Sequence, residues 1–386
     1  MDNSSLKIVY VTHARIPTQK AHGLATVKLC EAFAKAGAEV ELVVPRVWFS
    51  GDEDIHSFYN TQRNFAVTRL PAIDLGFLGM FERATFPLRF ISFSKIAAWY
   101  CLWKYNKANR VVYMSHDTIP LYFLSFIAKN IFYDIHDFPS HSLFARRVMK
   151  TARGFSVQAR SKIPFLMEHF GVSQEKIAYW PNGTEVSQFM AEGITKEEAR
   201  KKLSIPLQKK IVLYTGQLFG WKGVDTFIRA SSMIPDADFY IVGGTKKDIM
   251  RTKREARESQ NANIHFFGYR PHDQMPVWLR AADVAVLPNT GREDISRYWT
   301  SPMKLFEYMA SGTPIVASRL PSIEEVVDEG SAFFAEADSP QSFADAIQKA
   351  FRHGKEKGER AQQESARYTW DARAEKILTH IRTVLG

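Results

Sequence analysis

The sequence predicts an α/β protein made of two doubly wound, Rossmann-like parallel sheets. Short apolar runs alternate with helical segments from residue 7 onward, the alternation pauses over a polar stretch at residues 184–210, and it then starts again. Strands separated by helices form parallel sheets that are covered on both faces. The length of 386 residues also suits two domains better than one.

Each half contains several apolar runs that are bounded by turn residues and are short enough to be strands. In the first half the predicted strands are residues 7–12, 39–44, 66–70, 111–114, 131–135 and 155–158. In the second half they are residues 211–215, 238–242, 264–267, 284–287 and 313–317. An amphipathic helix is expected at residues 24–36, and Ser339-Pro340 has the sequence of a capped helix start.

The polar stretch at residues 184–210 sets the predicted domain boundary. We expect an N-terminal domain at residues 1–190, a C-terminal domain at residues 191–368, and a final helix at residues 369–386 that packs back across the N-terminal domain. Two such domains are expected to face a central cleft, because open α/β sheets bind ligands beyond the carboxyl ends of their strands.

Composition narrows the class of protein. The chain is 45% hydrophobic and 24% charged, as a folded globular protein is, and its formal charge of +10 indicates an acidic ligand. Nucleic acid, anionic lipid and phosphorylated small molecules all qualify, although no nucleic-acid-binding motif is present. Two distant cysteines argue against disulfides and zinc, and the first residues lack a signal-peptide pattern, so a cytoplasmic location is expected.

Residues 77–105 are aromatic, apolar and basic. This window is consistent with contact to an anionic membrane surface, which would make the protein peripheral on the inner face of the cell membrane. It is also consistent with two helices that pack on the sheet and turn a basic face to solvent. A second basic window, residues 146–162, holds six cations and no acid.

Chemically capable residues follow the predicted strands. In the first half these are Gly23 at a helix start, the pair His116-Asp117 and the pair His136-Asp137. Free N–H groups at a helix start suit phosphate, whereas histidine and aspartate can orient sugar hydroxyls or stabilise developing charge.

In the second half, Gly216 ends a strand and Lys222-Gly223 precedes a helix. A lysine beside a glycine at a helix start can bind a diphosphate through its charge and the backbone N–H groups. Glu307 lies in a helix that ends at Ser311-Gly312. Taken alone, this carboxylate is better explained as a salt-bridged residue of the helix. In a nucleotide site it would accept hydrogen bonds from the two ribose hydroxyls.

Four features together resemble the retaining GT-B glycosyltransferases of family 4: residues 216–225, residues 307–317, Pro181-Asn182-Gly183 and the two His-Asp loops. The resemblance covers essentially the whole chain. It implies a GT-B fold and a metal-independent hexosyltransferase without a cofactor, whose partners are a nucleotide-diphosphate-sugar donor and a glycan or lipid-linked acceptor rather than nucleic acid.

The resemblance also implies roles for residues. Donor-binding residues would be Gly23, Gly216, Gln217, Lys222, Ser301, Pro302, Lys304, Leu305 and Glu307. Catalytic residues would be His136, Asp137 and Lys222, acceptor-binding residues would be His13, His116 and Asp117, and no residue would bind a metal.

Two positions depart from the family pattern. Trp299 stands where the family usually has the first of two glutamates, and Gln217 stands where it usually has an arginine. Glu293 or Asp294 could replace the missing carboxylate. The alternative function is a GT-B protein that transfers nothing, either a sugar-nucleotide epimerase or an inactive binding subunit.

Overall fold

The computed structural model describes residues 6–46, 53–73, 82–106, 110–137, 141–190, 193–258 and 263–386. The chain divides into two compact units, Met1–Trp180 with Trp370–Gly386, and Pro181–Thr369. The sequence analysis places this division at residue 190. It lies earlier because Asn182 already hydrogen-bonds to Ser301 of the second unit.

Unit 1 is built on a seven-stranded parallel sheet with the order β3-β2-β1-β4-β5-β6-β7. The order reverses between β1 and β4, as in doubly wound folds. The strands are β1 (Lys7–Val11), β2 (Glu39–Pro45), β3 (Ala66–Leu70), β4 (Val111–Ser115), β5 (Ile131–Ile135), β6 (Gly154–Val157) and β7 (Ile177–Tyr179).

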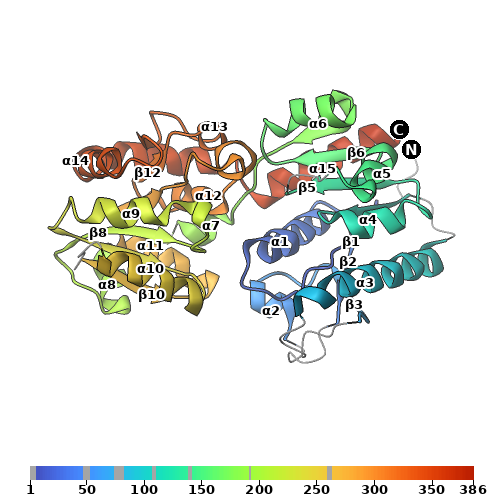
Figure 1. Cartoon of the computed structure of the whole chain (residues 1–386), viewed down its shortest axis with the longest axis horizontal. Coiled ribbons are helices and arrows are strands. Elements are labelled where there is room, and N and C mark those ends of the chain that lie inside the picture. The colour runs from blue at the N-terminus through green and yellow to red at the C-terminus, as the bar shows by residue number, and fades with distance from the viewer. Residues whose placement is uncertain are drawn as a thin grey trace. The chain divides into compact units, whose positions relative to one another are not determined.

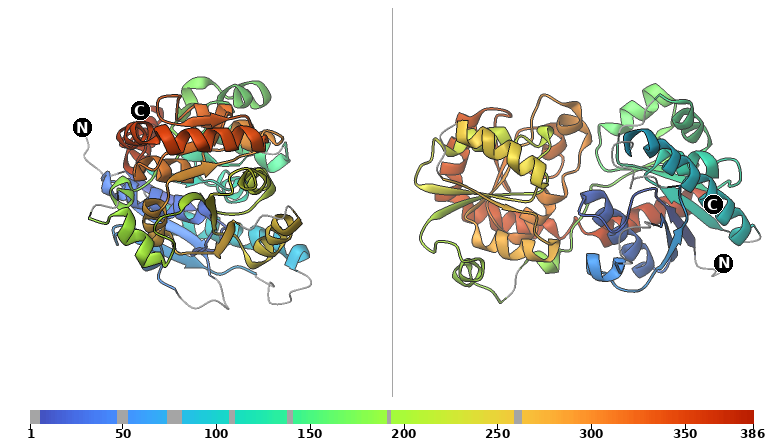
Figure 2. Two further views of the ribbon diagram at one scale, coloured as in Figure 1. Left: turned by 90° about the vertical axis from the view of Figure 1, so that its left-hand side faces the viewer. Right: turned by 60° about the horizontal axis from the view of Figure 1, so that its bottom comes forward.

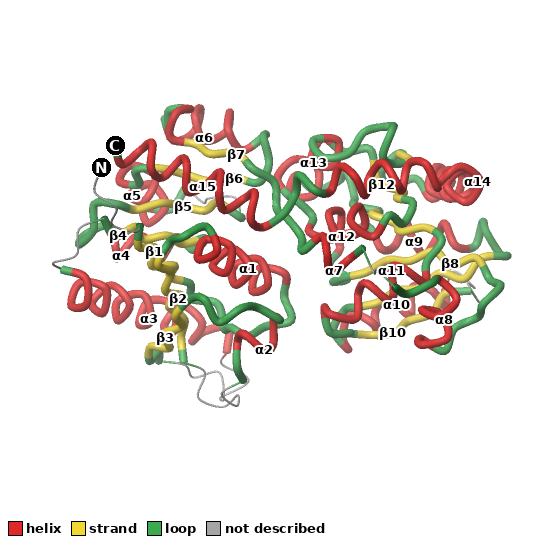
Figure 3. The backbone as a smooth tube through the Cα atoms, turned by 180° about the vertical axis from the view of Figure 1, so that it is seen from behind, coloured by secondary structure: helices red, strands yellow, loops and turns green. Residues whose placement is uncertain are grey.

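Helices cover both faces of this sheet (Figure 1). Helix α1 packs against α15, while α3, α4 and α5 pack against one another in order (Figure 3). The helices are α1 (Ala21–Lys35), α2 (Ile55–Tyr59), α3 (Glu82–Tyr105), α4 (Thr118–Leu124), α5 (Leu143–Thr151), α6 (Lys162–Phe170), the 3-10 helix η2 (Gln174–Lys176) and α15 (Trp370–Leu385). The last helix therefore belongs to unit 1.

Unit 2 repeats the design with a six-stranded parallel sheet of order β10-β9-β8-β11-β12-β13, again with helices on both faces (Figure 2). The strands are β8 (Lys210–Thr215), β9 (Ala237–Val242), β10 (Ile264–Gly268), β11 (Val284–Leu287), β12 (Ile315–Ser318) and β13 (Phe333–Ala335). The helices are α7 (Val186–Phe189), α8 (Lys196–Leu203), η3 (Gly220–Lys222), α9 (Val224–Ser231), α10 (Lys246–Glu258), η4 (His272–Gln274), α11 (Met275–Ala281), the π-helix η5 (Ile295–Trp299), α12 (Met303–Ser311), α13 (Pro321–Glu324) and α14 (Pro340–Ser365).

Each sheet is buried because both of its faces are apolar. In β8, Ile211 and Leu213 pack into one hydrophobic core of unit 2, while Val212 and Tyr214 pack into the core on the opposite face. Successive side chains of a strand point to opposite faces, so a central strand needs an unbroken apolar run. This explains why continuous apolar runs predict the strands correctly.

The predicted fold class and all eleven predicted strands are confirmed. The short strands β7 and β13 were not predicted. Residues 77–81 lie outside the described residues, and residues 82–105 form the single helix α3, so the alternative of two helices in this window does not hold for its described part. The first helix begins at Ala21 rather than at residue 24.

Candidate functional site

In unit 1 the titratable side chains that follow β1, β4 and β5 lie together, because these three strands are neighbours in the sheet. The rings of His116 and His136 stack with centroids 5.0 Å apart, and His13 Nε2 lies 3.3 Å from Asp117 Oδ1. His13, His116, Asp117 and His136 thus form one cluster, as the sequence predicts. Asp137 is exposed directly after His136.

Asp117 fixes the loop that follows β1. Its Oδ2 accepts hydrogen bonds from the Thr12 hydroxyl at 2.6 Å and from the His13 backbone N–H at 2.9 Å. Burial alone would raise the pKa of Asp117, but His116, His13 and these hydrogen bonds outweigh it and hold the pKa below its usual value. The carboxylate is therefore ionised at neutral pH, and it positions His13.

A buried network that the sequence analysis missed holds His136. His136 Nε2 lies 2.8 Å from Asp134 Oδ2 in β5, and Asp134 Oδ1 accepts hydrogen bonds from Ser156 and from Arg373 Nη2, the latter at 2.8 Å. The Asp134 and Arg373 side chains are 0% and 1% exposed. Arg373 comes from α15 and also donates to the Trp180 carbonyl.

This network sets the protonation of His136. Burial lowers the pKa of His136, and the charge of Asp134 offsets only part of that effect. A carboxylate only accepts hydrogen bonds, so the neutral imidazole carries its proton on Nε2 and leaves Nδ1 as an acceptor. His136 is therefore suited to accept a hydrogen bond from a sugar hydroxyl at neutral pH.

Gly23 has a packing role in unit 1. Its N–H donates to the Lys20 carbonyl at 3.1 Å, so this N–H is not free for a phosphate. A Cβ at this position would lie 2.4 Å from the Tyr59 hydroxyl and 2.5 Å from Thr18 Cγ2. The space beside Gly23 is already filled, and this alone explains the glycine.

In unit 2, Gly216 and Lys304 meet at the carboxyl end of β8. Gly216 has a φ of +116°, and a Cβ there would lie 3.3 Å from both Cε and Nζ of Lys304. Lys304 Nζ also lies 3.7 Å from the centroid of the Tyr214 ring, where a cation is attracted by the ring face. A side chain at position 216 would crowd the Lys304 ammonium group.

Among the described residues, Lys304 is buried without a carboxylate in hydrogen-bond contact. Its side chain is only 8% exposed, and within the described residues Nζ has no hydrogen-bond acceptor. Burial lowers the pKa of Lys304 well below its usual value, the nearby charge of Lys222 lowers it further, and the charge of Glu307 offsets only part of this effect. Burial also lowers the pKa of Lys222, to about 7. Two desolvated lysines therefore lie together in a place where an anion would stabilise both.

Glu307 lies one helical turn beyond Lys304 in α12 and is 7% exposed. It has a partner that the sequence analysis missed, because His272 Nε2 in η4 lies 3.0 Å from its Oε1. Gly312 ends α12 in the left-handed conformation, as predicted. Glu307 is thus a paired carboxylate, and the described residues supply a hydrogen bond to one of its two oxygens.

The remaining predicted donor residues surround α12 and the end of β8. Ser301 accepts a hydrogen bond from Asn182 N–H at 3.0 Å and so holds the Pro181-Asn182-Gly183 turn, while Pro302 is the N-cap residue of α12. Leu305 is fully buried in the core, which gives its side chain a packing role. The Gln217 carbonyl accepts a hydrogen bond from the Tyr214 hydroxyl at 2.6 Å.

The position of the missing family glutamate lies in the π-helix η5, where Trp299 is half-buried. Glu293, just before this helix, comes close to η3: a Cβ on Gly220 would lie 3.9 Å from Glu293 Oε1. Glu293 therefore reaches the loop that carries Lys222. Beyond β11, Asn289 is fully buried, and within the described chain neither side-chain amide atom has a hydrogen-bond partner.

Two kinds of feature are absent from the described part of the chain. No group of three or more His, Cys, Asp or Glu side chains in this part of the chain is arranged to hold a metal ion. None of its helices is long and apolar enough to cross a membrane.

Comparison with known proteins agrees with this architecture. Residues 209–353, within unit 2, match the family model "Glycosyl transferases group 1". The D-inositol 3-phosphate glycosyltransferase of Corynebacterium urealyticum is 24% identical over 262 residues, which cover 64% of this chain and 60% of that protein. The chain thus matches about 60% of the length of this curated relative.

Solved structures match over nearly the whole chain. Sucrose-phosphate synthase from Thermosynechococcus elongatus has a TM-score of 0.80 at 18% identity and covers 98% of this chain and 99% of its own. Alr3699/HepE from Anabaena, in complex with UDP and glucose, has a TM-score of 0.74 at 18% identity, with coverages of 98% and 100%. The chain therefore has the GT-B fold, and the part that forms most of its second unit matches the group 1 glycosyltransferases.

Proposed function

We propose that the protein is a glycosyltransferase that moves a sugar from a nucleotide-diphosphate-sugar donor to an acceptor hydroxyl, with retention of configuration. Lys304 carries this proposal, because its buried amino group has no hydrogen-bond acceptor among the described residues and lies near a second lysine, so a ligand anion would stabilise its charged form. The family match of unit 2 supports the same class of ligand. The UDP complex of the Anabaena neighbour makes UDP-sugars the first donors to test.

The contacts described above support the following roles. Lys222 and Lys304 bind the diphosphate, Glu307 accepts hydrogen bonds from the ribose hydroxyls, and His272 orients Glu307. In unit 1, Nδ1 of His136 accepts a hydrogen bond from a sugar hydroxyl, and His13 and His116 contribute to the acceptor site.

The proposed reaction balances without a separate protein base. The bond from C1 of the sugar to the phosphate oxygen breaks, a bond from C1 to the acceptor oxygen forms on the same face, and the acceptor proton moves to the departing phosphate. Negative charge grows on the diphosphate, so the positive charges of Lys222 and Lys304 would stabilise the transition state more than the ground state. Neither a metal nor a cofactor has a step in this scheme.

A turnover assay tests the proposal. UDP-sugars are incubated with the protein, with and without glycan and lipid-linked acceptors, and released UDP and the sugar products are separated. Acceptor-dependent release of UDP with a new glycosidic bond supports the transferase. Conversion of the sugar nucleotide without an acceptor would instead identify an epimerase. Nucleotide binding without turnover would identify a binding subunit, which the departures at Trp299 and Gln217 make the second candidate.

The affinity for a nucleoside diphosphate is expected to fall as the pH rises above 7. Binding an anion favours the protonated lysines, and the free protein loses the Lys222 proton as the pH rises through the Lys222 pKa of about 7. Binding therefore takes up protons, and affinity falls by up to about tenfold per pH unit for each proton taken up. Titrations between about pH 6 and pH 9 measure this slope.

Lys222→Arg is the matched control for this pH dependence. A guanidinium group stays protonated throughout the range, so the variant should show a shallower slope than the wild type. A flat profile for the wild-type protein would contradict the assignment of these lysines to the diphosphate.

A further inference from the structure

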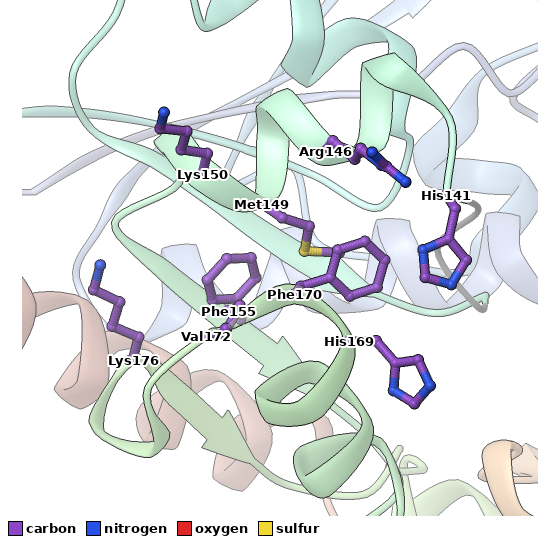
Figure 4. A pocket seen from close by; sticks show the side chains of 10 residues that line it. His141, Arg146, Met149, Lys150, Phe155, His169, Phe170, Val172 and Lys176 are labelled. Carbon is purple, nitrogen blue, oxygen red and sulfur yellow. The ribbon is translucent and has the colours of Figure 1, made fainter.

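Unit 1 contains a basic groove away from the residues discussed so far. It lies between α5 and the segment from α6 to η2, has a volume of about 610 Å³, and is shown in Figure 4. Its lining residues are His141, Arg146, Met149, Lys150, Phe155, His169, Phe170, Gly171, Val172 and Lys176. Three permanent cations and two histidines line it, and no carboxylate is among its described lining residues.

The groove has an apolar floor and a basic rim. Met149, Phe155 and Val172 are buried, whereas Arg146, Lys150 and Lys176 are exposed at the edges (Figure 4). Residues 141–167 contain six cations and no acid. The carboxylates next in sequence are Glu168 and Glu175, both exposed and neither in the lining.

Large apolar side chains are exposed beside the rim. Leu143 is 81% exposed, and Leu143, Arg146 and Lys150 share one stripe of α5 because they are spaced by three and four residues. Phe144 and Met167 are also exposed, on α5 and α6. Phe126 is 58% exposed and lies 3.7 Å beneath the guanidinium group of Arg147.

We propose that this surface, defined as the α5–α6 groove with Leu143, Phe144 and Met167 beside it, docks on an anionic lipid bilayer. Lipid phosphates would lie against Arg146, Lys150 and Lys176, and the apolar side chains would enter the boundary between head groups and acyl chains. Cations beside exposed apolar and aromatic residues are the composition of interfacial binding surfaces.

Other occupants fit less well. A free phosphate would use the cations but would leave Leu143 and Phe144 in water. A second copy of the chain in a symmetric dimer would bring the same basic surface against itself, because both partners of a two-fold interface contribute the same patch. The bilayer satisfies both the charge and the apolar exposure. This adds a surface to the proposed function but does not depend on it, because the groove shares no residue with the proposed nucleotide site.

Co-sedimentation of the full chain with vesicles tests the inference. Binding is expected to vesicles of phosphatidylcholine with phosphatidylglycerol, to weaken with added salt, and to be much weaker for phosphatidylcholine alone. Each basic side chain near an anionic surface contributes about a fivefold factor, so Arg146→Ala with Lys150→Ala should weaken binding about 25-fold. Leu143→Ser should weaken vesicle binding further, because it removes an exposed apolar side chain from this surface.

The matched control is Lys201→Ala with Lys202→Ala on α8 of unit 2, which removes the same charge from another exposed helix. An equal loss in this control would show non-specific attraction and overturn the inference. The inference would also be overturned if the wild type did not bind vesicles. If glycerol phosphate stabilised the protein through Arg146 and Lys150 without vesicle binding, the groove would be a site for a soluble anion, and the inference would again be overturned. Nucleotide binding by the same variants reports separately on the proposed function, since the two sites share no residue.

Discussion

Glu307→Gln is expected to lower the affinity for the preferred nucleoside diphosphate on the order of 100-fold. The substitution keeps the shape of the side chain and its hydrogen bond from His272 but removes the charge. Hydrogen bonds to a charged group contribute about 1.5–3 kcal/mol each, and the carboxylate would accept two from the ribose. Titration calorimetry on the wild type and the variant measures the difference.

The control for this prediction is Glu359→Gln, an equal change of charge on the exposed surface of α14 in the same unit. It should bind the nucleotide as the wild type does. Glu307→Gln should also unfold at nearly the wild-type denaturant concentration, since His272 keeps an acceptor. An unchanged affinity in Glu307→Gln would mean that this carboxylate serves only to pair with His272, which is the structural alternative that the sequence leaves open.

Arg373→Met is expected to destabilise the protein by about 3–5 kcal/mol. The substitution leaves the fully buried Asp134 carboxylate without its cation and removes the hydrogen bond to the Trp180 carbonyl. Removing one partner of a buried ion pair costs far more than removing an exposed charge, because the other charge stays desolvated. Urea unfolding of the variant and the wild type gives the difference in the free energy of unfolding.

Two further variants make this result specific. Arg382→Met removes an exposed arginine from the same helix and should change stability by less than about 0.5 kcal/mol. Adding Asp134→Asn to Arg373→Met should restore most of the lost stability, because no unpaired charge then remains. An Asn amide facing His136 would still disturb the proton on Nε2, so activity should stay low. If Arg373→Met were as stable as Arg382→Met, the ion pair would not hold α15 on unit 1.

The ion pair between Asp134 and Arg373 also predicts how the stability of the protein changes at acidic pH. Burial opposes the ionisation of Asp134, but His136 and Arg373 outweigh it and hold its pKa well below the usual value. A folded-state pKa below the unfolded-state value of about 3.9 gives stability that is present above about pH 4 and is lost as the pH falls below it.

The central strands can be predicted from the sequence because each is marked by a continuous apolar run within the strand itself. Residues 131–135 and 211–215, for example, form continuous apolar runs that match β5 and β8. The strands that were not predicted, β7 and β13, are three residues long and lie at the edges of the two sheets. An edge strand of this length has too few residues for a pattern, and its formation depends on pairing with its neighbour.

The candidate site is predictable only where chemistry follows a strand. His116 and His136 were identified in this way, whereas Lys304 was identified only through the resemblance to family 4. Asp134 gave a usable signal, since it is a carboxylate within the apolar strand IFYDI, just as Glu307 is within α12. Its partner Arg373 lies on the buried stripe of α15 with Ile377, but it is 239 residues away along the chain, and helical periodicity indicates burial without naming a partner.

His272 gave no signal, because it stands in a short turn without any periodic pattern. Gly23 has a packing explanation that the sequence pattern does not indicate. A glycine at a helix start suits a phosphate in general, but here Thr18, five residues earlier in the chain, and Tyr59 in α2 occupy the space beside it.

The most direct test of the central claim is a calorimetric titration of the wild-type protein with UDP, GDP, ADP and CDP, and with the nucleoside of each. The buried ammonium group of Lys304 needs an anion, so one diphosphate should bind and its nucleoside should bind at least about 100-fold more weakly. If no diphosphate binds, or if the nucleoside binds as tightly as its diphosphate, then Lys304 and Lys222 do not hold a diphosphate and the transferase assignment falls.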